Sequence, residues 1–149
     1  MSASALRADM TQSVPDEAEE LISGVRALAH LATCDDGRPH AAPVWYRYES
    51  GVDDESGVVE LVTTGRKLAN LRSNPHVSLS IARERPNREG RPEWSVTLLG
   101  TATVVDDEEA SLAASRRINR KYGVDEDAWA GENTLVRVEV GSAGYRTYD

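Results

Sequence analysis

The alternation of hydrophobic and polar residues predicts strands along most of the chain. Runs of valine, isoleucine, leucine and threonine with a period of two are typical of half-buried strands. The predicted strands cover residues 26–35, 38–49, 58–64, 76–84, 93–106, 134–140 and 143–148. Because the connections between most of these strands are short, we expect a mainly antiparallel sheet.

Helices are predicted in three places. Ser13 is a candidate N-cap for a short helix that Gly24 ends. Residues 67–74 carry Leu68 and Leu71 on one face, and Pro75 stops that helix. The clearest helical pattern covers residues 108–122, with its three arginines, at 116, 117 and 120, expected on a solvated outer face.

Glycines and prolines mark the connections. Asp36-Gly37 favours a tight hairpin turn because both residues tolerate positive φ. Residues 49–57 and 85–92 are predicted loops. Gly100, inside a long strand, indicates a bulge or sharp bend of the kind that closes small barrels. We therefore expect six or seven antiparallel strands closed into a barrel, with helices flanking it and any ligand on its outside.

Length and composition favour one domain. The chain has 149 residues, of which 40% are hydrophobic, enough for one compact core. We predict a disordered tail at residues 1–12 and a single domain at 13–149. No apolar run approaches the roughly 20 residues of a membrane span, and no signal-peptide layout is present. The expected protein is soluble and cytoplasmic, without a membrane partner.

Charge and metal-binding residue types exclude several classes of function. A net charge of −8 argues against a nucleic-acid surface, which needs a basic face. The single cysteine, Cys34, and three scattered histidines predict no disulfide and no metal site. Only two of the 17 basic residues are lysines, Lys67 and Lys121.

The turn after the strand at 58–64 is the strongest candidate binding feature. Thr63, Thr64 and Gly65 precede Arg66 and Lys67 at the start of a helix. Free backbone N–H groups, hydroxyls and two cations together favour a phosphate group. Taken by its spacing alone, the same turn also fits an ordinary strand-to-helix connection with a solvated basic pair.

Three segments together resemble a known family. They read AHLATCDDGRPHAAPVWY, VVELVTTGRKLANLRSNPHVSLSI and EWSVTLLGTATVVDD, and lie within residues 20–108. Their order resembles the pyridoxamine 5′-phosphate oxidase-like flavoproteins of the split-barrel fold, including the branch that uses deazaflavin. The resemblance implies a split β-barrel of the FMN-binding type. It also implies a homodimer with the flavin at its interface.

The resemblance also implies site residues. It assigns the cofactor phosphate to Thr63, Thr64, Arg66 and Lys67. It aligns the second hairpin strand with the isoalloxazine ring, through Ala42, Pro43, Val44 and Trp45. It assigns Trp94 and Ser95 of the neighbouring subunit to the completion of the pocket.

The expected function is that of an FMN-dependent oxidoreductase. Hydride transfer to or from a small substrate or electron acceptor is cofactor chemistry, so no catalytic residue is assigned. One alternative keeps the fold and uses deazaflavin F420. Another is a protein without turnover of its own, either a flavin or haem carrier or a stress-associated binding module.

The C-terminal end departs from the oxidases that name the family. Those oxidases carry an arginine and tryptophan signature for pyridoxamine phosphate, whereas this chain ends in VEVGSAGYRTYD. Oxidation of pyridoxamine phosphate is therefore not expected. Without phenylalanine in the chain, Tyr145 and Tyr148 are the candidates near the C-terminus for stacking on a ring.

Overall fold

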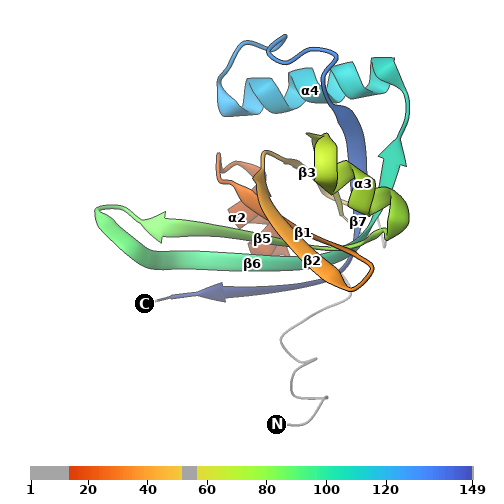
Figure 1. Ribbon diagram of the computed structural model, residues 1–149. Coiled ribbons are helices and arrows are strands. Elements are labelled where there is room, and N and C mark those ends of the chain that lie inside the picture. The colour runs from red at the N-terminus through yellow and green to blue at the C-terminus, as the bar shows by residue number, and fades with distance from the viewer. Residues whose placement is uncertain (1–13, 52–56, 149) are drawn as a thin grey trace.

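The computed structural model describes residues 14–51 and 57–148. Within these ranges, seven strands form one antiparallel sheet and three helices lie outside it (Figure 1). The strands are β1 (Ala29–Asp35), β2 (Arg38–Val44), β3 (Arg47–Glu49), β4 (Val58–Thr63), β5 (His76–Arg85), β6 (Arg88–Val105) and β7 (Thr134–Thr147). The helices are α2 (Asp16–Ser23), α3 (Gly65–Ser73) and α4 (Glu108–Tyr122).

The sheet closes on itself because of one short connection. Its strand order is β2-β1-β5-β6-β7-β4-β3, so β2 and β3 lie at opposite ends of the pairing order. Only Trp45 and Tyr46 join these two strands, a reach of about 10 Å. The sheet must therefore curl until its two edges meet. The predicted antiparallel barrel is confirmed.

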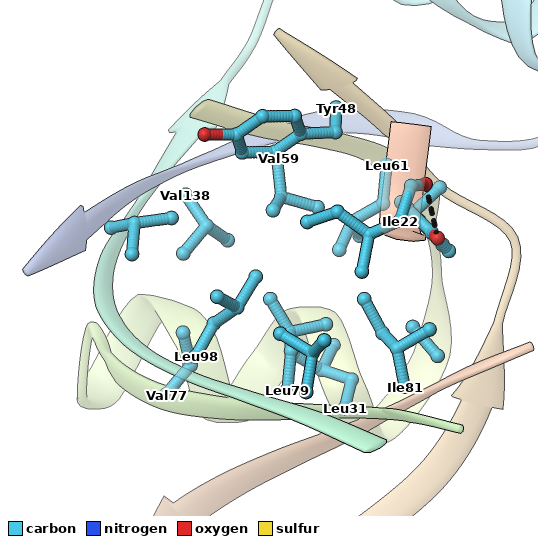
Figure 2. Close-up of a cluster of buried hydrophobic side chains, with 14 of the residues drawn as sticks. Ile22, Leu31, Tyr48, Val59, Leu61, Val77, Leu79, Ile81, Leu98 and Val138 are labelled. Atoms are coloured by element: carbon cyan, nitrogen blue, oxygen red, sulfur yellow. Dashed lines mark hydrogen bonds between the residues drawn. The ribbon is translucent and has the colours of Figure 1, made fainter. Parts of the chain in front are cut away.

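The barrel interior is filled by its own side chains. Leu31, Leu61, Leu79, Ile81 and Leu98 are fully buried and converge in the centre (Figure 2). Each such side chain contributes roughly 1.5–3 kcal/mol to folding through its removal from water. A ligand of any size therefore has to lie outside the barrel, as the strand pattern predicts.

The prediction of a loop at residues 85–92 is wrong. β5 continues to Arg85 and β6 begins at Arg88, so only Pro86 and Asn87 form the turn. Asn87 adopts a positive φ of 62°, which asparagine tolerates in tight turns. The prolines did not break the strands because Pro86 lies in the turn and Pro92 lies at a register irregularity. The resulting hairpin projects as a long arm (Figure 1), and residues 83–93 are called the hairpin arm below.

Two other predictions are wrong in how the strands are divided, and β1 begins at Ala29, three residues later than predicted. The strand predicted at 38–49 is split into β2 and β3, since the chain changes edges of the sheet at Trp45 and Tyr46. The last two predicted strands are one strand, β7, with Gly141 as the extra residue of a bulge. Gly100 stands beside that bulge, in the opposite strand.

The helices agree with the pattern more closely. α4 has the predicted bounds, with Asp107 as its N-cap and Gly123 in a left-handed conformation at its end. α3 begins at Gly65, two residues earlier than predicted. α2 begins at Asp16 with Pro15 as its N-cap, so the predicted cap at Ser13 is wrong, whereas Gly24 ends the helix as predicted. Ser13 itself, the 1–12 tail and residues 52–56 of the predicted 49–57 loop lie outside the described residues.

Candidate functional site

The start of α3 has an unusual charge arrangement. Helix N-termini usually carry acidic residues, because the first backbone N–H groups and the helix dipole favour negative charge. The first turn of α3 has no acidic residue and instead carries Arg66 and Lys67. Neither cation forms an ion pair with a carboxylate within the described parts of the chain. An anion at this position would satisfy both the backbone donors and the two side chains.

The backbone before α3 leaves that position open. Thr64 is the N-cap in an extended conformation, and its hydroxyl does not cap the helix. Gly65 has a positive φ of 70°, and a Cβ atom built on it meets no atom within 4 Å. Arg66 is exposed and Lys67 is half-buried. The turn therefore has the free donors and the space that a phosphate group requires.

Two buried polar atoms beside α3 have no hydrogen-bond partner among the described residues. They are Thr63 Oγ1 and His40 Nδ1. Thr63 directly precedes the turn, and His40 pairs with Thr33, whose hydroxyl accepts a hydrogen bond of 3.0 Å from Asn70 of α3. Buried groups of this kind are usually paired in folded proteins. The orphaned hydroxyl of Thr63 fits a site that a ligand completes, so these residues suit a cofactor phosphate.

The predicted ring-binding strand is an edge of the sheet. β2 pairs only with β1, which suits Pro43 because proline has no N–H to donate to a second neighbour. Ala42 is half-buried and Val44 is buried toward the barrel, whereas Pro43 is exposed. Pro43 therefore lies on the outside of the barrel wall, where a flat ring could approach.

Trp45 leaves β2 and joins an aromatic cluster. Its indole stacks on Tyr122 of α4, with centroids 4.5 Å apart and planes 5° apart, and meets Trp129 edge-on at 6.0 Å. Beside this stack, Lys121 Nζ donates to the carbonyl of Tyr46 at 2.9 Å and lies 3.7 Å from the centre of its ring. Burial, aided by the charge of Arg47, lowers the pKa of Lys121 to about 8.

The two residues predicted to serve a neighbouring subunit point to opposite sides of β6. Trp94 is 4% exposed and packs into the barrel core. Ser95 points outward, where its hydroxyl lies 3.3 Å from the hydroxyl of Tyr148. Ser95 is therefore the member of the pair whose side chain can reach a second chain.

The outer face of the barrel near Pro43 and Ser95 lacks acidic, lysine and arginine side chains. This outer sheet face consists of outward-facing positions on four adjacent strands: Pro39, Ala41 and Pro43 on β2, His30, Ala32 and Cys34 on β1, Ser78, Ser80 and Ala82 on β5, and Ser95, Thr97, Leu99 and Thr101 on β6. None of these positions carries Asp, Glu, Lys or Arg, although 28% of the chain is charged. Leu99, 44% exposed, lies within it.

Sequence reasoning missed a buried carboxylate on β4. Glu60 is fully buried, and its oxygens accept hydrogen bonds of 2.8–3.2 Å from Arg47, Arg117 and Arg137. Burial opposes ionisation of Glu60, but the hydrogen bonds from Arg117 and Arg47 outweigh it and hold the pKa below its usual range. The sequence signal for this buried carboxylate was the position of Glu60 in the middle of the apolar run VVELV. A carboxylate on a buried strand needs hydrogen-bonding or charged partners inside the protein. Arg117 is accordingly an ion-pair partner, and not the solvated side chain that the helical pattern predicted.

A separate cavity lies beside α4, away from the basic turn. It has a volume of about 640 Å³, and its lining includes Asp106, Asp107, Glu108 and Trp129. These carboxylates would repel a phosphate group. Arg72 of α3 binds Asp106 through two hydrogen bonds of 2.7 and 2.9 Å and so separates this acidic rim from the basic turn.

Residues 14–51 and 57–148 contain no group of three or more His, Cys, Asp or Glu side chains arranged to hold a metal. No helix within the same ranges has the length and hydropathy to cross a membrane.

The seven-stranded closed sheet with three outer helices defines a split β-barrel protein. Its sequence matches the family model described as pyridoxamine 5′-phosphate oxidase over residues 14–146. The chain therefore belongs to the pyridoxamine 5′-phosphate oxidase family. The resemblance seen in the sequence is confirmed.

Solved structures share the fold. One is described as an F420 reductase, with 22% identity, a TM-score of 0.65, and coverage of 88% of this chain and 98% of that one. A FAD-binding protein from Mesorhizobium loti has 20% identity, a TM-score of 0.64 and coverage of 89% and 93%. HutZ, the haem storage protein from Vibrio cholerae, has 20% identity, a TM-score of 0.63 and coverage of 91% and 94%. At these identities the likeness shows the fold alone. No curated protein matches the sequence.

Proposed function

We propose that this protein is an FMN-dependent oxidoreductase that binds its cofactor at a homodimer interface. The observation that carries the proposal is the start of α3. Among the described residues, neither Arg66 nor Lys67 forms an ion pair, and Thr63 Oγ1 has no hydrogen-bond partner. In the proposed site, these groups and Thr64 hold the phosphate of FMN. The family membership supports a flavin as the ligand.

The chain's residues bind and orient the cofactor, which when bound supplies hydride transfer. The outer edge of β2, from Ala42 to Trp45, lies along the ring, and Pro43 leaves the wall flat at the point of closest approach. The stack of Trp45 on Tyr122 fixes the end of that strand. Ser95 from the second chain completes the pocket, next to the core residue Trp94 that anchors its strand. The substrate is a small molecule or electron acceptor.

The phosphate assignment predicts a difference between two flavins. Replacing Arg66→Ala and Lys67→Ala together should weaken FMN by about 100-fold, since each charge-assisted hydrogen bond contributes roughly 1.5–3 kcal/mol. Riboflavin, which lacks the phosphate, should lose less than threefold. Flavin fluorescence quenching measures both affinities.

Arg72→Ala is the matched control. Arg72 lies on the same helix but is paired with Asp106, so its removal should leave FMN affinity within about twofold of wild type. Equal weakening of FMN and riboflavin by the double variant would show that the basic pair supports the fold and not the phosphate.

A second candidate cofactor is deazaflavin F420, whose phosphate makes the same demand on the turn. The structural likeness to an F420 reductase supports this alternative.

The absorption spectrum of the purified protein distinguishes the candidate cofactors. FMN has two bands in the visible and near-ultraviolet range, whereas F420 has one band and blue-green fluorescence. A haem spectrum would favour the third alternative, a non-catalytic haem-binding protein. If reduced bound flavin is reoxidised no faster by quinones than by air, the protein is a flavin carrier and not an oxidoreductase.

A further inference from the structure

The hairpin arm carries a small pocket formed by arginines. Arg85, Arg88 and Arg91 line a cavity of about 140 Å³ together with Pro92 and Tyr148. The guanidinium of Arg85 is anchored because it donates a hydrogen bond to the carbonyl oxygen of Tyr148. The β7 end that bears Tyr148 is held in turn by a backbone hydrogen bond from Tyr148 N to Glu93 O of 3.0 Å. The pocket is therefore built from two segments, β5–β6 and the end of β7.

Among the described residues, no carboxylate neutralises the positive charge of this pocket. Arg85 and Arg88 are directly paired across the hairpin, and like charges in that position destabilise a strand pair. Neither they nor Arg91 form an ion pair with any described carboxylate, although the chain contains 25 acidic residues. The one ion pair on the arm, at 3.5 Å, joins Arg83 to Glu93 outside the pocket. Repulsion of this kind is relieved when an anion binds among the three cations.

The size and chemistry of the pocket define the ligand. A volume of 140 Å³ equals about five water molecules in the liquid, which is enough for one tetrahedral oxyanion. Guanidinium groups bind the oxygens of phosphate and carboxylate through paired hydrogen bonds. We propose that the arginines of the hairpin arm form a second anion-binding site, which takes a phosphate-sized oxyanion group of a small molecule. This site does not depend on the proposed function, because none of its residues belongs to the turn at 63–67.

A titration of the full chain with inorganic phosphate tests the site, with ¹H–¹⁵N NMR as the readout. The amides of Glu89, Gly90 and Arg91 should shift with a saturable dependence on phosphate. The amides of Gly65 and Lys67 report separately on the turn, so failure of one site leaves the other readable.

Variants identify the groups that bind. Arg88→Ala and Arg91→Ala should each raise the dissociation constant for phosphate at the arm at least fivefold. Arg83→Ala, the matched control on the same hairpin arm, should change it less than twofold because Arg83 is paired with Glu93. Equal effects of all three variants, or no saturable shift in the arm of the wild-type protein, would overturn the proposal.

A further comparison identifies the source of the oxyanion. If the arm binds a second phosphate of a dinucleotide cofactor, Arg91→Ala should weaken FAD but leave FMN unchanged. If the arm serves a separate anionic substrate, FAD and FMN affinities should both be unchanged and phosphate should still bind to the arm of the flavin-loaded protein. Loss of phosphate binding at the arm of the FMN-loaded protein, with the affinity for FAD unaffected, would contradict both sources.

Discussion

At the scale of single residues, Glu60 shows how one buried charge organises a face of the barrel. Its three arginine partners come from β3, α4 and β7, so one carboxylate ties together elements that are distant in sequence. Arg47 and Arg137 also bind Glu49, which extends the network to the end of β3. Removing one member of such a cluster leaves buried charges uncompensated.

Glu60→Gln should therefore lower the free energy of unfolding by about 3 kcal/mol at pH 7. Because the folded state lowers the pKa of Glu60, the unfolded state binds this proton more readily. The stabilisation is complete above the unfolded pKa of about 4.5 and is lost as pH falls through the lower, folded pKa. The difference between wild type and variant should thus shrink in acid.

Urea unfolding at a series of pH values measures this difference. Glu139→Gln is the control, since Glu139 lies exposed on β7 and its change should cost less than about 0.5 kcal/mol. A wild-type advantage that stays constant from neutral pH to strong acid would rule out the ionised carboxylate as its source.

At the scale of elements, β6 and β7 form the longest ladder in the sheet and bend together. Gly100 of β6 lies opposite Val140, beside the Gly141 bulge, where the two backbones approach closely. A Cβ atom at Gly100 would lie 2.4 Å from the carbonyl oxygen of Glu139 and 2.7 Å from a methyl carbon of Val138. The glycine that the sequence flags as a bend is thus required by the backbone of the opposite strand.

Gly100→Ala should destabilise the fold by about 2 kcal/mol or more, because the carbonyl oxygen it meets belongs to the backbone and cannot rotate away. Gly141→Ala is the matched control, since a Cβ there meets its nearest atom at 3.5 Å, an ordinary contact. Thermal unfolding of both variants gives the comparison. If Gly141→Ala lost more stability than Gly100→Ala, the bulge at Gly141, and not the close approach of the two backbones at Gly100, would be the reason that glycine is required.

At the scale of the whole molecule, the outer sheet face defined above bears on assembly. It consists of serine, threonine, alanine and proline side chains with His30, Cys34 and one exposed leucine, so burying it desolvates no carboxylate, lysine or arginine. In a chain of net charge −8, a surface without carboxylates is also the surface on which two copies repel each other least. Since Pro43 and Ser95 both lie on it, a dimer through this face would bring the two halves of the proposed cofactor site together.

Leu99→Arg should convert the proposed dimer into a monomer, because two arginines would be brought together at the interface. Sedimentation should show a mass near that of one 16.3 kDa chain for the variant and twice that mass for wild type. Trp129→Arg, at another exposed hydrophobic residue but beside α4, should stay dimeric. The dimer model fails if wild type sediments as a monomer or if Trp129→Arg dissociates as readily as Leu99→Arg.

The sequence by itself determined the local features of this protein. The strand periods, the Asp36-Gly37 turn, the bounds of α4 and the cationic start of α3 all follow from neighbouring residues. In helices and turns, the hydrogen bonds join residues only a few positions apart, and the face on which a side chain lies follows from the same short spacing. The family motifs lie within these same local segments, which is why they could be recognised.

Only the tertiary structure decided what depends on distant partners. The arginines around Glu60, the stack of Trp45 on Tyr122 and the burial of Trp94 each join residues far apart in the chain. The hairpin arm was misread because prolines act as breakers unless a turn or a register irregularity accommodates them, and pairing between strands fixes that register. The order of the strands around the barrel likewise depends on pairing between distant segments, which no local pattern encodes.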